Sequence, residues 1–209
     1  MTAALDERTQ AVALPRLLAP EICDAFVRTL WKDLLAGRAA IQTHQEEGLR
    51  KNAIEIHGRN YAPLLALHWG LTPTVAGIVG RDLLPSFVFF RIYFEGDVLR
   101  VHSDRAACEI SLSLTLASSD SQPWPLSIGM APADPSRGVE ENFGDEPFDS
   151  FAMNAGDALL YRGTERRHGR LQPNPNRWSA HAFFMWVDAA GEHHDRAFER
   201  LDLGAAPNF

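Results

Sequence analysis

Three residues of this chain have side chains that can bind a metal ion. His102 and Asp104 form a His-x-Asp motif, and His168 lies further along the chain. Residues two apart on an extended segment point to the same face, so one ion can bind both side chains. Two histidines and one carboxylate on one face of an iron ion leave its other positions open for a cosubstrate and oxygen. We therefore predict a metal site formed by His102, Asp104 and His168.

The motif by itself is weak, because a histidine two residues before an acid occurs three times. The three copies are His44-x-Glu46, His102-x-Asp104 and His193-x-Asp195. His44 lies in a polar segment without strand character, and His193 follows the last predicted strand, so we interpret both as surface residues. His102 instead ends a strand-turn-strand unit and precedes a strongly alternating strand. His168 lies at the far end of the same block of strands, where it can serve as the third ligand.

A second group of residues is suited to binding a carboxylate. Arg177 opens the last predicted strand, and Ser179 and His181 follow on the same strand face. A planar guanidinium matches a carboxylate with two parallel hydrogen bonds, and a nearby hydroxyl adds another. The alternative is an edge-strand arginine with its head in water. Given the predicted metal site, we favour Arg177 as the anchor for the distal carboxylate of a dicarboxylate.

The elements that must position these residues change from helical to extended along the chain. Helices are predicted over residues 20–36, 61–69 and from 72 to before Pro85, from apolar spacing and from proline and glycine at their ends. Strands are predicted over residues 87–94, 108–116, 124–130, 150–153, 158–162 and 177–187. The strand 108–116 alternates strictly, and its polar face carries Ser111, Ser113 and Thr115. Residues 131–149, rich in proline, glycine and acids, are predicted to form a long loop.

Helices followed by a block of strands predict an α+β fold. The expected architecture is a double-stranded β-helix (jelly roll) with the N-terminal helices packed on one sheet. We expect a single domain over residues 1–209. Within it, residues 1–85 form a helical N-terminal part, residues 86–189 the jelly-roll core and residues 190–209 a C-terminal tail.

Composition excludes several classes of partner. The chain has 209 residues, of which 45% are hydrophobic, which is enough for one core. Its net charge of -7 argues against binding the phosphate backbone of nucleic acids or an anionic membrane surface. Its two cysteines do not form a disulfide framework, its N-terminus has no signal pattern, and no apolar run approaches the roughly 20 residues of a membrane span. We expect a cytoplasmic protein, and the sequence predicts no oligomeric state.

In order along the chain, these motifs resemble the iron(II)/2-oxoglutarate-dependent oxygenase superfamily, most closely its prolyl-hydroxylase-like branch. The resemblance covers about half of the chain. It rests on Tyr93-Phe94-Glu95-Gly96-Asp97, His102-Ser103-Asp104, Asn154-Ala155-Gly156-Asp157-Ala158-Leu159-Leu160-Tyr161, His168 and Arg177-Trp178-Ser179. It implies the double-stranded β-helix, with His102, Asp104 and His168 as iron ligands. It also implies a 2-oxoglutarate site with Arg177 on the distal carboxylate, Tyr93 and Ser179 nearby, and Ser113 and Thr115 on the inward strand face.

The reaction implied by the resemblance uses Fe(II), 2-oxoglutarate and O2, with ascorbate as a candidate reductant. It would hydroxylate an unactivated C–H bond and release succinate and CO2. No side chain beyond the metal ligands is expected to be catalytic. Halogenating relatives replace the carboxylate ligand with a small residue, so the presence of Asp104 favours hydroxylation or desaturation.

The substrate is less defined, and three alternatives stay open. We favour a small molecule such as an amino acid or a natural-product intermediate. The alternatives are a peptidyl (prolyl-type) hydroxylase acting on a protein, a non-catalytic jelly-roll protein that binds a metal or ligand, and a cupin-like zinc isomerase or hydrolase. The loop 131–149 is either a lid or a solvated acidic excursion. Candidate substrate contacts are His181, Arg105, Glu109, Trp124 and Arg170.

Overall fold

The computed structural model describes residues 4–44, 47–49, 51–134 and 136–198. These residues form two α-helices, α1 (Pro20–Leu35) and α2 (Ala62–Val79), and two β-sheets. The large sheet has the order β1 (Ala11–Leu14), β9 (Ala158–Tyr161), β6 (Ile110–Ser118), β11 (Trp178–Asp188), β4 (Leu83–Phe94), β3 (Ala53–His57) and β2 (Gln42–His44). The small sheet has the order β5 (Leu99–His102), β10 (Arg166–Arg170), β7 (Leu126–Pro132) and β8 (Phe148–Phe151).

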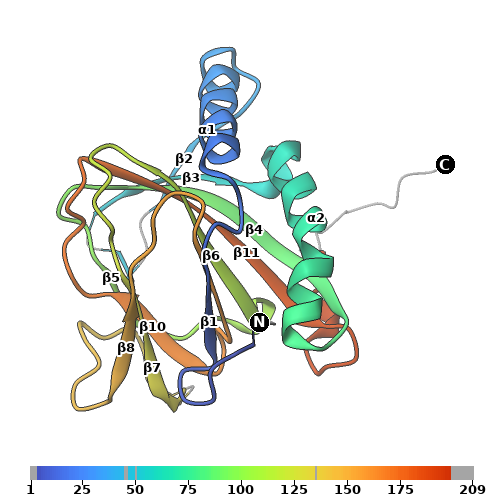
Figure 1. Cartoon of the computed structure of the whole chain (residues 1–209), viewed down its shortest axis with the longest axis vertical. Coiled ribbons are helices and arrows are strands. Elements are labelled where there is room, and N and C mark those ends of the chain that lie inside the picture. The colour runs from blue at the N-terminus through green and yellow to red at the C-terminus, as the bar shows by residue number, and fades with distance from the viewer. Residues whose placement is uncertain (1–3, 45–46, 50, 135, 199–209) are drawn as a thin grey trace.

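The strands from β4 to β11 alternate between the two sheets, except that the consecutive strands β7 and β8 both belong to the small sheet. β4, β6, β9 and β11 belong to the large sheet, and β5, β7, β8 and β10 to the small one, which lies beside it in Figure 1. Neighbouring strands in both sheets pair antiparallel. This is the topology of a double-stranded β-helix, and it confirms the predicted α+β jelly roll. One consequence is that β5 and β10, far apart in the sequence, lie side by side.

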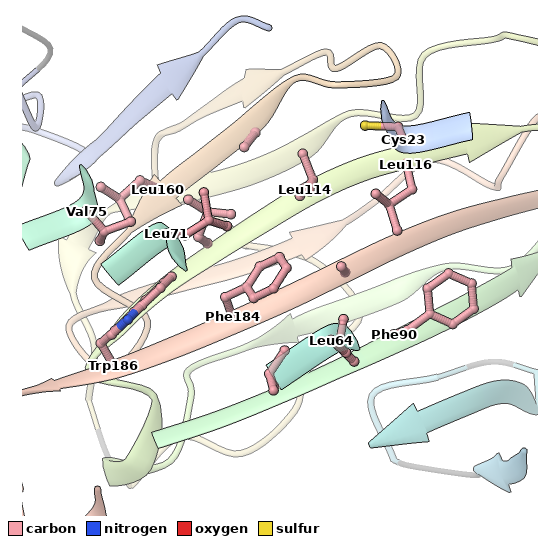
Figure 2. Close-up of a cluster of buried hydrophobic side chains, with 14 of the residues drawn as sticks. Cys23, Leu64, Leu71, Val75, Phe90, Leu114, Leu116, Leu160, Phe184 and Trp186 are labelled. Carbon is pink, nitrogen blue, oxygen red and sulfur yellow. The ribbon is translucent and has the colours of Figure 1, made fainter. Parts of the chain in front are cut away.

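The outer face of the large sheet carries the main hydrophobic core. Leu114 of β6 and Phe184 and Trp186 of β11 are almost fully buried there. Figure 2 shows these side chains together with Leu64 and Val75 of α2. α1 contacts β6 and α2 contacts β4, so both N-terminal helices pack on this one sheet, as predicted (Figure 1). With its outer face covered by helices, the large sheet turns its other face, which carries polar residues such as Ser111 and apolar residues such as Phe183, toward the small sheet.

One of the two helices differs from the prediction. α1 coincides with the helix predicted over residues 20–36, but the helices predicted over residues 61–69 and from residue 72 form one continuous helix, α2, with Pro73 inside it. A proline inside a helix removes one backbone hydrogen bond. The buried residues of α2, which lie on both sides of this proline, are Leu64, His68, Leu71 and Val75. Packing of this stripe on the sheet stabilises the helix more than local propensity does.

α2 also corrects the expectation that no segment approaches a membrane span. It is 18 residues long and is apolar enough to cross a membrane by length and composition. A single helix of this kind is a weak indication, because helices that cover a hydrophobic core meet the same criteria. Here α2 lies on β4 and packs Leu64, Leu71 and Val75 against the core of the large sheet, although only 22% of its apolar window is buried.

The segment 1–85 is not helical throughout, which corrects the predicted division of the chain. β1, β2 and β3 lie in it and extend the large sheet at both edges. β10 forms where the sequence predicts a basic loop, and β2 contains His44, whose segment lacks a strand pattern. These strands have three to five residues, too few to show alternation, so pairing with a neighbour decides them. Of the predicted tail 190–209, residues 199–209 lie outside the described residues.

Candidate metal centre

His102 and His168 lie opposite each other on adjacent strands. His102 is the last residue of β5 and His168 the middle residue of β10, and the antiparallel register pairs them directly. Their ring centroids are 4.5 Å apart. Asp104 follows β5, and its backbone N–H donates to the carbonyl of Gly163. Strand pairing thus brings the distant histidine to the His-x-Asp motif, and the structure places the three predicted ligands together.

Backbone carbonyls orient both imidazole rings. Nδ1 of His102 lies 2.8 Å from the carbonyl oxygen of Arg100, and Nδ1 of His168 lies 3.1 Å from that of Arg166. A ring nitrogen facing a carbonyl carries the proton, so in the neutral form of either ring the lone pair is on Nε2. The two Nε2 atoms lie 3.8 and 3.5 Å from Oδ1 of Asp104. All three ligand atoms are within 4.8 Å of one another, a spacing that one ion can bridge.

Asp104 is held as an anion. Its Oδ2 accepts a hydrogen bond of 2.7 Å from the hydroxyl of Ser111, which leaves Oδ1 toward the two histidines. Burial raises the pKa of Asp104, but His168, His102 and the Ser111 hydroxyl outweigh it and hold the pKa at about 2. Ser111 comes from the polar face of β6 that the sequence predicts to turn inward. Its role as support for the carboxylate is one that sequence reasoning missed.

Gly163 makes room for the carboxylate. A Cβ atom at this position would lie 2.1 Å from Oδ2 of Asp104, 2.5 Å from the hydroxyl oxygen of Ser111 and 2.7 Å from the carbonyl oxygen of Cys108. The last of these is backbone and cannot turn aside. A side chain at residue 163 and the observed position of Asp104 therefore exclude each other.

A cavity of about 390 Å³ opens in front of the three ligands. Its apolar wall is formed by Phe87 and Phe89 of β4 and by Phe183 and Met185 of β11. The rings of Phe89 and Phe183 stack with centroids 4.7 Å apart. The space in front of the candidate metal site is therefore enclosed on this side by hydrocarbon, which excludes water from a reacting group.

Val139, from the loop 131–149, lines another part of this cavity. Glu140 and Val101 exchange two backbone hydrogen bonds of 2.8 and 2.9 Å, which tie the loop to β5 next to His102. Phe143 is buried, and Val139 lines the cavity. Val139 and Glu140 therefore bring part of the loop against the site, while most of the described residues of the loop are exposed.

Arg177 lies outside the site, which contradicts the prediction that it anchors a carboxylate there. Its side chain is 74% exposed and forms an ion pair with Asp120, 3.5 Å away, on the surface. Its backbone N–H also donates to the Asp120 carboxylate. β11 begins only at Trp178, so Arg177 precedes the paired part of the strand and its side chain lies beyond the end of the sheet. The strand-face argument fails because the covered part of that face begins two residues later.

Three other predicted residues face a second cavity. Thr115, Ser179 and His181 are buried and line a space of about 420 Å³, and none of them lines the cavity of the metal ligands. The hydroxyl of Ser179 donates to Asn174 Oδ1 and accepts from Asn176 Nδ2, so it is already used within the protein. Burial and the charge of Arg170 lower the pKa of His181 well below its usual range, which keeps this histidine neutral.

Arg170 is fully buried and is absent from the lining of both cavities. Its Nη1 donates to the carbonyl of Trp124, and its guanidinium carbon lies 4.7 Å over the Trp124 ring. Burial lowers the pKa of Arg170 to about 10, so it is still charged at neutral pH. Trp124 lines the second cavity, and its indole N–H donates a hydrogen bond of 2.7 Å to the carbonyl oxygen of Gln172. Ser113, also buried, lies 3.5 Å from Nη2 of Arg170.

Of the remaining predicted residues, some line the cavity of the metal ligands and one does not. Arg105 lines the cavity of the metal ligands, where its guanidinium carbon lies 4.7 Å over the ring of Phe87. Glu109 is not part of the site, because its carboxylate accepts the backbone N–H of Asp188 instead. Tyr93 lines the cavity as predicted. The sequence prediction missed Arg91, which lines the same cavity; its alternation with Tyr93 along β4 is the signal that could have found it.

Comparison with known proteins bears on the fold. No family model and no curated protein sequence matches the chain. The alpha-ketoglutarate-dependent carbocyclase SnoK from nogalamycin biosynthesis aligns with a TM-score of 0.68 and 11% identity over 88% of this chain and 82% of its own. HygX from Streptomyces hygroscopicus, solved with nickel, 2-oxoglutarate and hygromycin B, aligns with a TM-score of 0.65 and 11% identity over 88% and 85%.

A prolyl-4-hydroxylase from Pseudomonas putida aligns with a TM-score of 0.57 and 16% identity over 85% of this chain and 92% of its own. At these identities the likeness concerns the fold and not the activity. The residues of the site have to be judged on their own geometry. The chain has the double-stranded β-helix fold that these three solved structures share.

Proposed function

We propose that the protein is an Fe(II)- and 2-oxoglutarate-dependent oxygenase that hydroxylates an unactivated C–H bond of a small molecule. The observation that carries this proposal is the arrangement of His102, Asp104 and His168. Two Nε2 lone pairs and one carboxylate oxygen converge at the wall of a largely apolar cavity. The fold and the resemblance of the motifs agree with it.

The three ligands fit an iron(II) ion in particular. Two histidines and one carboxylate that leave positions open are the donor set of non-haem iron(II) sites, whereas cupin-like zinc enzymes favour more histidines. Among the residues that the structure describes, this group contains no fourth histidine, cysteine or acid. The carbonyl partners of both Nδ1 atoms and the hydroxyl of Ser111 supply the outer contacts that such ligands need.

The barrel interior also fits the second group, 2-oxoglutarate. A dicarboxylate that binds a metal at one end needs a cation for the other, and the exposed Arg177 does not provide it. Arg91 and Arg170 are both buried inside the jelly roll. With iron and 2-oxoglutarate bound, the site would supply oxidation of a C–H bond by O2, with succinate and CO2 released. The chain itself holds the ligands, positions the cosubstrate and excludes water.

The cavity favours a small substrate over a protein. Its wall combines the rings of Phe87, Phe89 and Phe183 with one exposed cation, Arg105, and the loop residue Val139 covers another side. HygX and the epimerase SnoN, which share the fold, have been solved with hygromycin B and nogalamycin RO respectively. Turnover stimulated by peptides but not by small metabolites would instead support a peptidyl hydroxylase.

The proposal is tested by iron loading and succinate release. Protein loaded anaerobically with Fe(II) and then given 2-oxoglutarate and O2 should release succinate slowly even without a substrate. His102→Ala removes a ligand, so iron affinity and succinate release should fall by at least about 100-fold. His193→Ala removes a histidine of the same His-x-Asp spacing outside the site and serves as the matched control. Wild-type protein that binds no iron, or a His102→Ala variant with full turnover, would sink the assignment.

A further inference from the structure

Arg170 is a buried cation without an acidic partner. Its exposure is 0%, and among the described residues no carboxylate lies within 4.0 Å of its guanidinium. Nη1 donates a hydrogen bond to the carbonyl of Trp124. Nε has no hydrogen-bond partner. Nη2 has only two long contacts of 3.5 Å, one to Ser113 and one to His181. An arginine that is buried without compensation is strongly unfavourable, so its unpaired edge calls for an anion.

The unpaired edge has the geometry that a carboxylate needs. Nε–H and Nη2–H lie side by side on one edge of the planar guanidinium, and such an edge grips a carboxylate with two parallel hydrogen bonds. The bond from Nη1 to Trp124 and the contact with its ring fix the plane of the group. A second donor is His181, which lines the second cavity: its Nδ1 faces Nη2 of Arg170, and its Nε2 is buried without a partner.

The position of Arg170 relative to the metal ligands is also suitable. It follows His168 by two residues on β10, so both side chains point into the jelly roll, roughly 7 Å apart along the strand. β6 has a parallel pair of residues two apart: Ser111 donates a hydrogen bond to Asp104, and Ser113 contacts Arg170. Tyr93 and Tyr161 line the metal cavity and lie within electrostatic reach of Arg170.

The other arginines near the site are less suited to the same role. Arg91 lines the cavity, but its Nε and Nη2 already pair with Glu55, which is itself buried. Arg105 is exposed at the cavity wall, and Arg177 is paired with Asp120 on the surface. Of the arginines in the described barrel, Arg170 combines burial, a free edge and the absence of an acidic partner.

We propose that Arg170, two residues after the metal ligand His168, binds the distal carboxylate of 2-oxoglutarate in place of Arg177, with His181 as a second donor. This inference rests on the proposed function of the same site. It differs from the sequence prediction in the strand that supplies the anchor, β10 instead of the end of β11.

The test compares two oxo acids that share the metal-binding end. 2-Oxoglutarate has the distal carboxylate and 2-oxobutyrate lacks it. Their dissociation constants are measured by calorimetry on protein loaded with Ni(II), for the wild type and for Arg170→Met, Arg91→Met and Arg177→Met. In Arg170→Met the affinity for 2-oxoglutarate should fall about 10- to 100-fold, while that for 2-oxobutyrate changes little, because charged hydrogen bonds to the distal carboxylate are lost. Arg177→Met should change neither constant.

The ratio of the two affinities separates an anchor from a structural residue. A merely structural Arg170 would weaken both ligands equally or lower only the melting temperature, and this outcome would overturn the inference. The inference would also be overturned if Arg91→Met or Arg177→Met, instead of Arg170→Met, lowered the affinity for 2-oxoglutarate relative to that for 2-oxobutyrate. If Arg170→Met does not fold, Arg170→Lys keeps the charge without the two-pronged edge and should still reduce the ratio. A wild type that binds neither oxo acid refutes the proposed function itself, which is a different result.

Discussion

At the scale of single residues, the candidate metal site depends on small neighbours as much as on its ligands. His102 and His168 would lose their fixed orientation without the carbonyls that hold Nδ1, and Asp104 without the hydroxyl of Ser111. Gly163 contributes by having no side chain at all. The site is therefore sensitive to changes at residues that carry no chemistry of their own.

Gly163→Ala is expected to weaken metal binding without unfolding the protein. The added methyl group overlaps Oδ2 of Asp104 and the backbone of Cys108, so the carboxylate must move away from the two histidines. We expect the affinity for Fe(II) or Ni(II), measured by titration, to fall by about tenfold or more.

Gly70→Ala is the matched control for this change. Gly70 lies within α2, and a Cβ atom there would meet nothing within 4 Å. Alanine should stabilise the helix by up to about 1 kcal/mol and leave metal affinity unchanged. Equal metal affinity in Gly163→Ala and the wild type would show that Asp104 can relocate freely, against the geometry described.

At the scale of elements, α2 shows how packing overrides local signals. Pro73 and Gly70 both predict an end to the helix, yet the helix continues because its buried stripe lies on the large sheet. His68 is part of that stripe. Its Nε2 lies 2.9 Å from the carbonyl oxygen of Met185, and its ring packs against Phe184 and Trp186.

His68 should make the protein less stable in mild acid. Burial lowers the pKa of His68 from 6.5 to about 4. Below pH 6.5 the unfolded chain gains a proton at this residue, while the folded protein does not until about pH 4, so stability falls as pH decreases through this window. The loss approaches about 3 kcal/mol for a shift of this size.

His68→Gln provides the comparison. Glutamine keeps a donor for the carbonyl of Met185 but does not titrate. Urea unfolding at pH 7 and at pH 4.5 should show a smaller drop in the free energy of unfolding for His68→Gln than for the wild type. Parallel pH dependence in the two proteins would mean that His68 is protonated in the folded state or is not buried.

At the scale of the whole molecule, the N-terminal segment joins the two sheets. β1 pairs with β9 at the edge of the large sheet, from Ala11 opposite Tyr161 to Leu14 opposite Ala158. Just before it, Arg8 forms an ion pair of 3.0 Å with Asp149 of β8 in the small sheet. The segment therefore covers an edge of the large sheet and makes an exposed ion pair with the small one.

Removal of residues 1–15 should destabilise the protein and promote association. The deletion exposes the edge of β9, whose free backbone groups can pair with another chain. We expect a lower melting temperature and concentration-dependent light scattering.

A synthetic peptide of residues 4–15 provides the control for this deletion. Added in trans, it should restore both properties by strand addition. An unchanged melting temperature in the truncated protein would show that β1 contributes little to stability.

The sequence by itself predicted the fold class, and it predicted the candidate metal ligands from the His-x-Asp motif, the strands around it and the family resemblance. Alternation on β6 and the order of helices and strands indicate a jelly roll, and His102-x-Asp104 spans the end of one strand. It did not determine β2 or β10, which are too short to show a pattern, nor the merging of the helices around Pro73. It also missed the outer support from Ser111 and Gly163.

The tertiary structure alone decided which arginine lies inside. Alternation tells which residues share a side of a strand, but it does not tell where another layer covers that side. Arg177 shares its side with Ser179 yet lies past the end of the ladder in water, whereas Arg170, in an apparent basic loop, lies on a paired strand and is buried. Burial depends on the opposite sheet, and no local pattern contains that information.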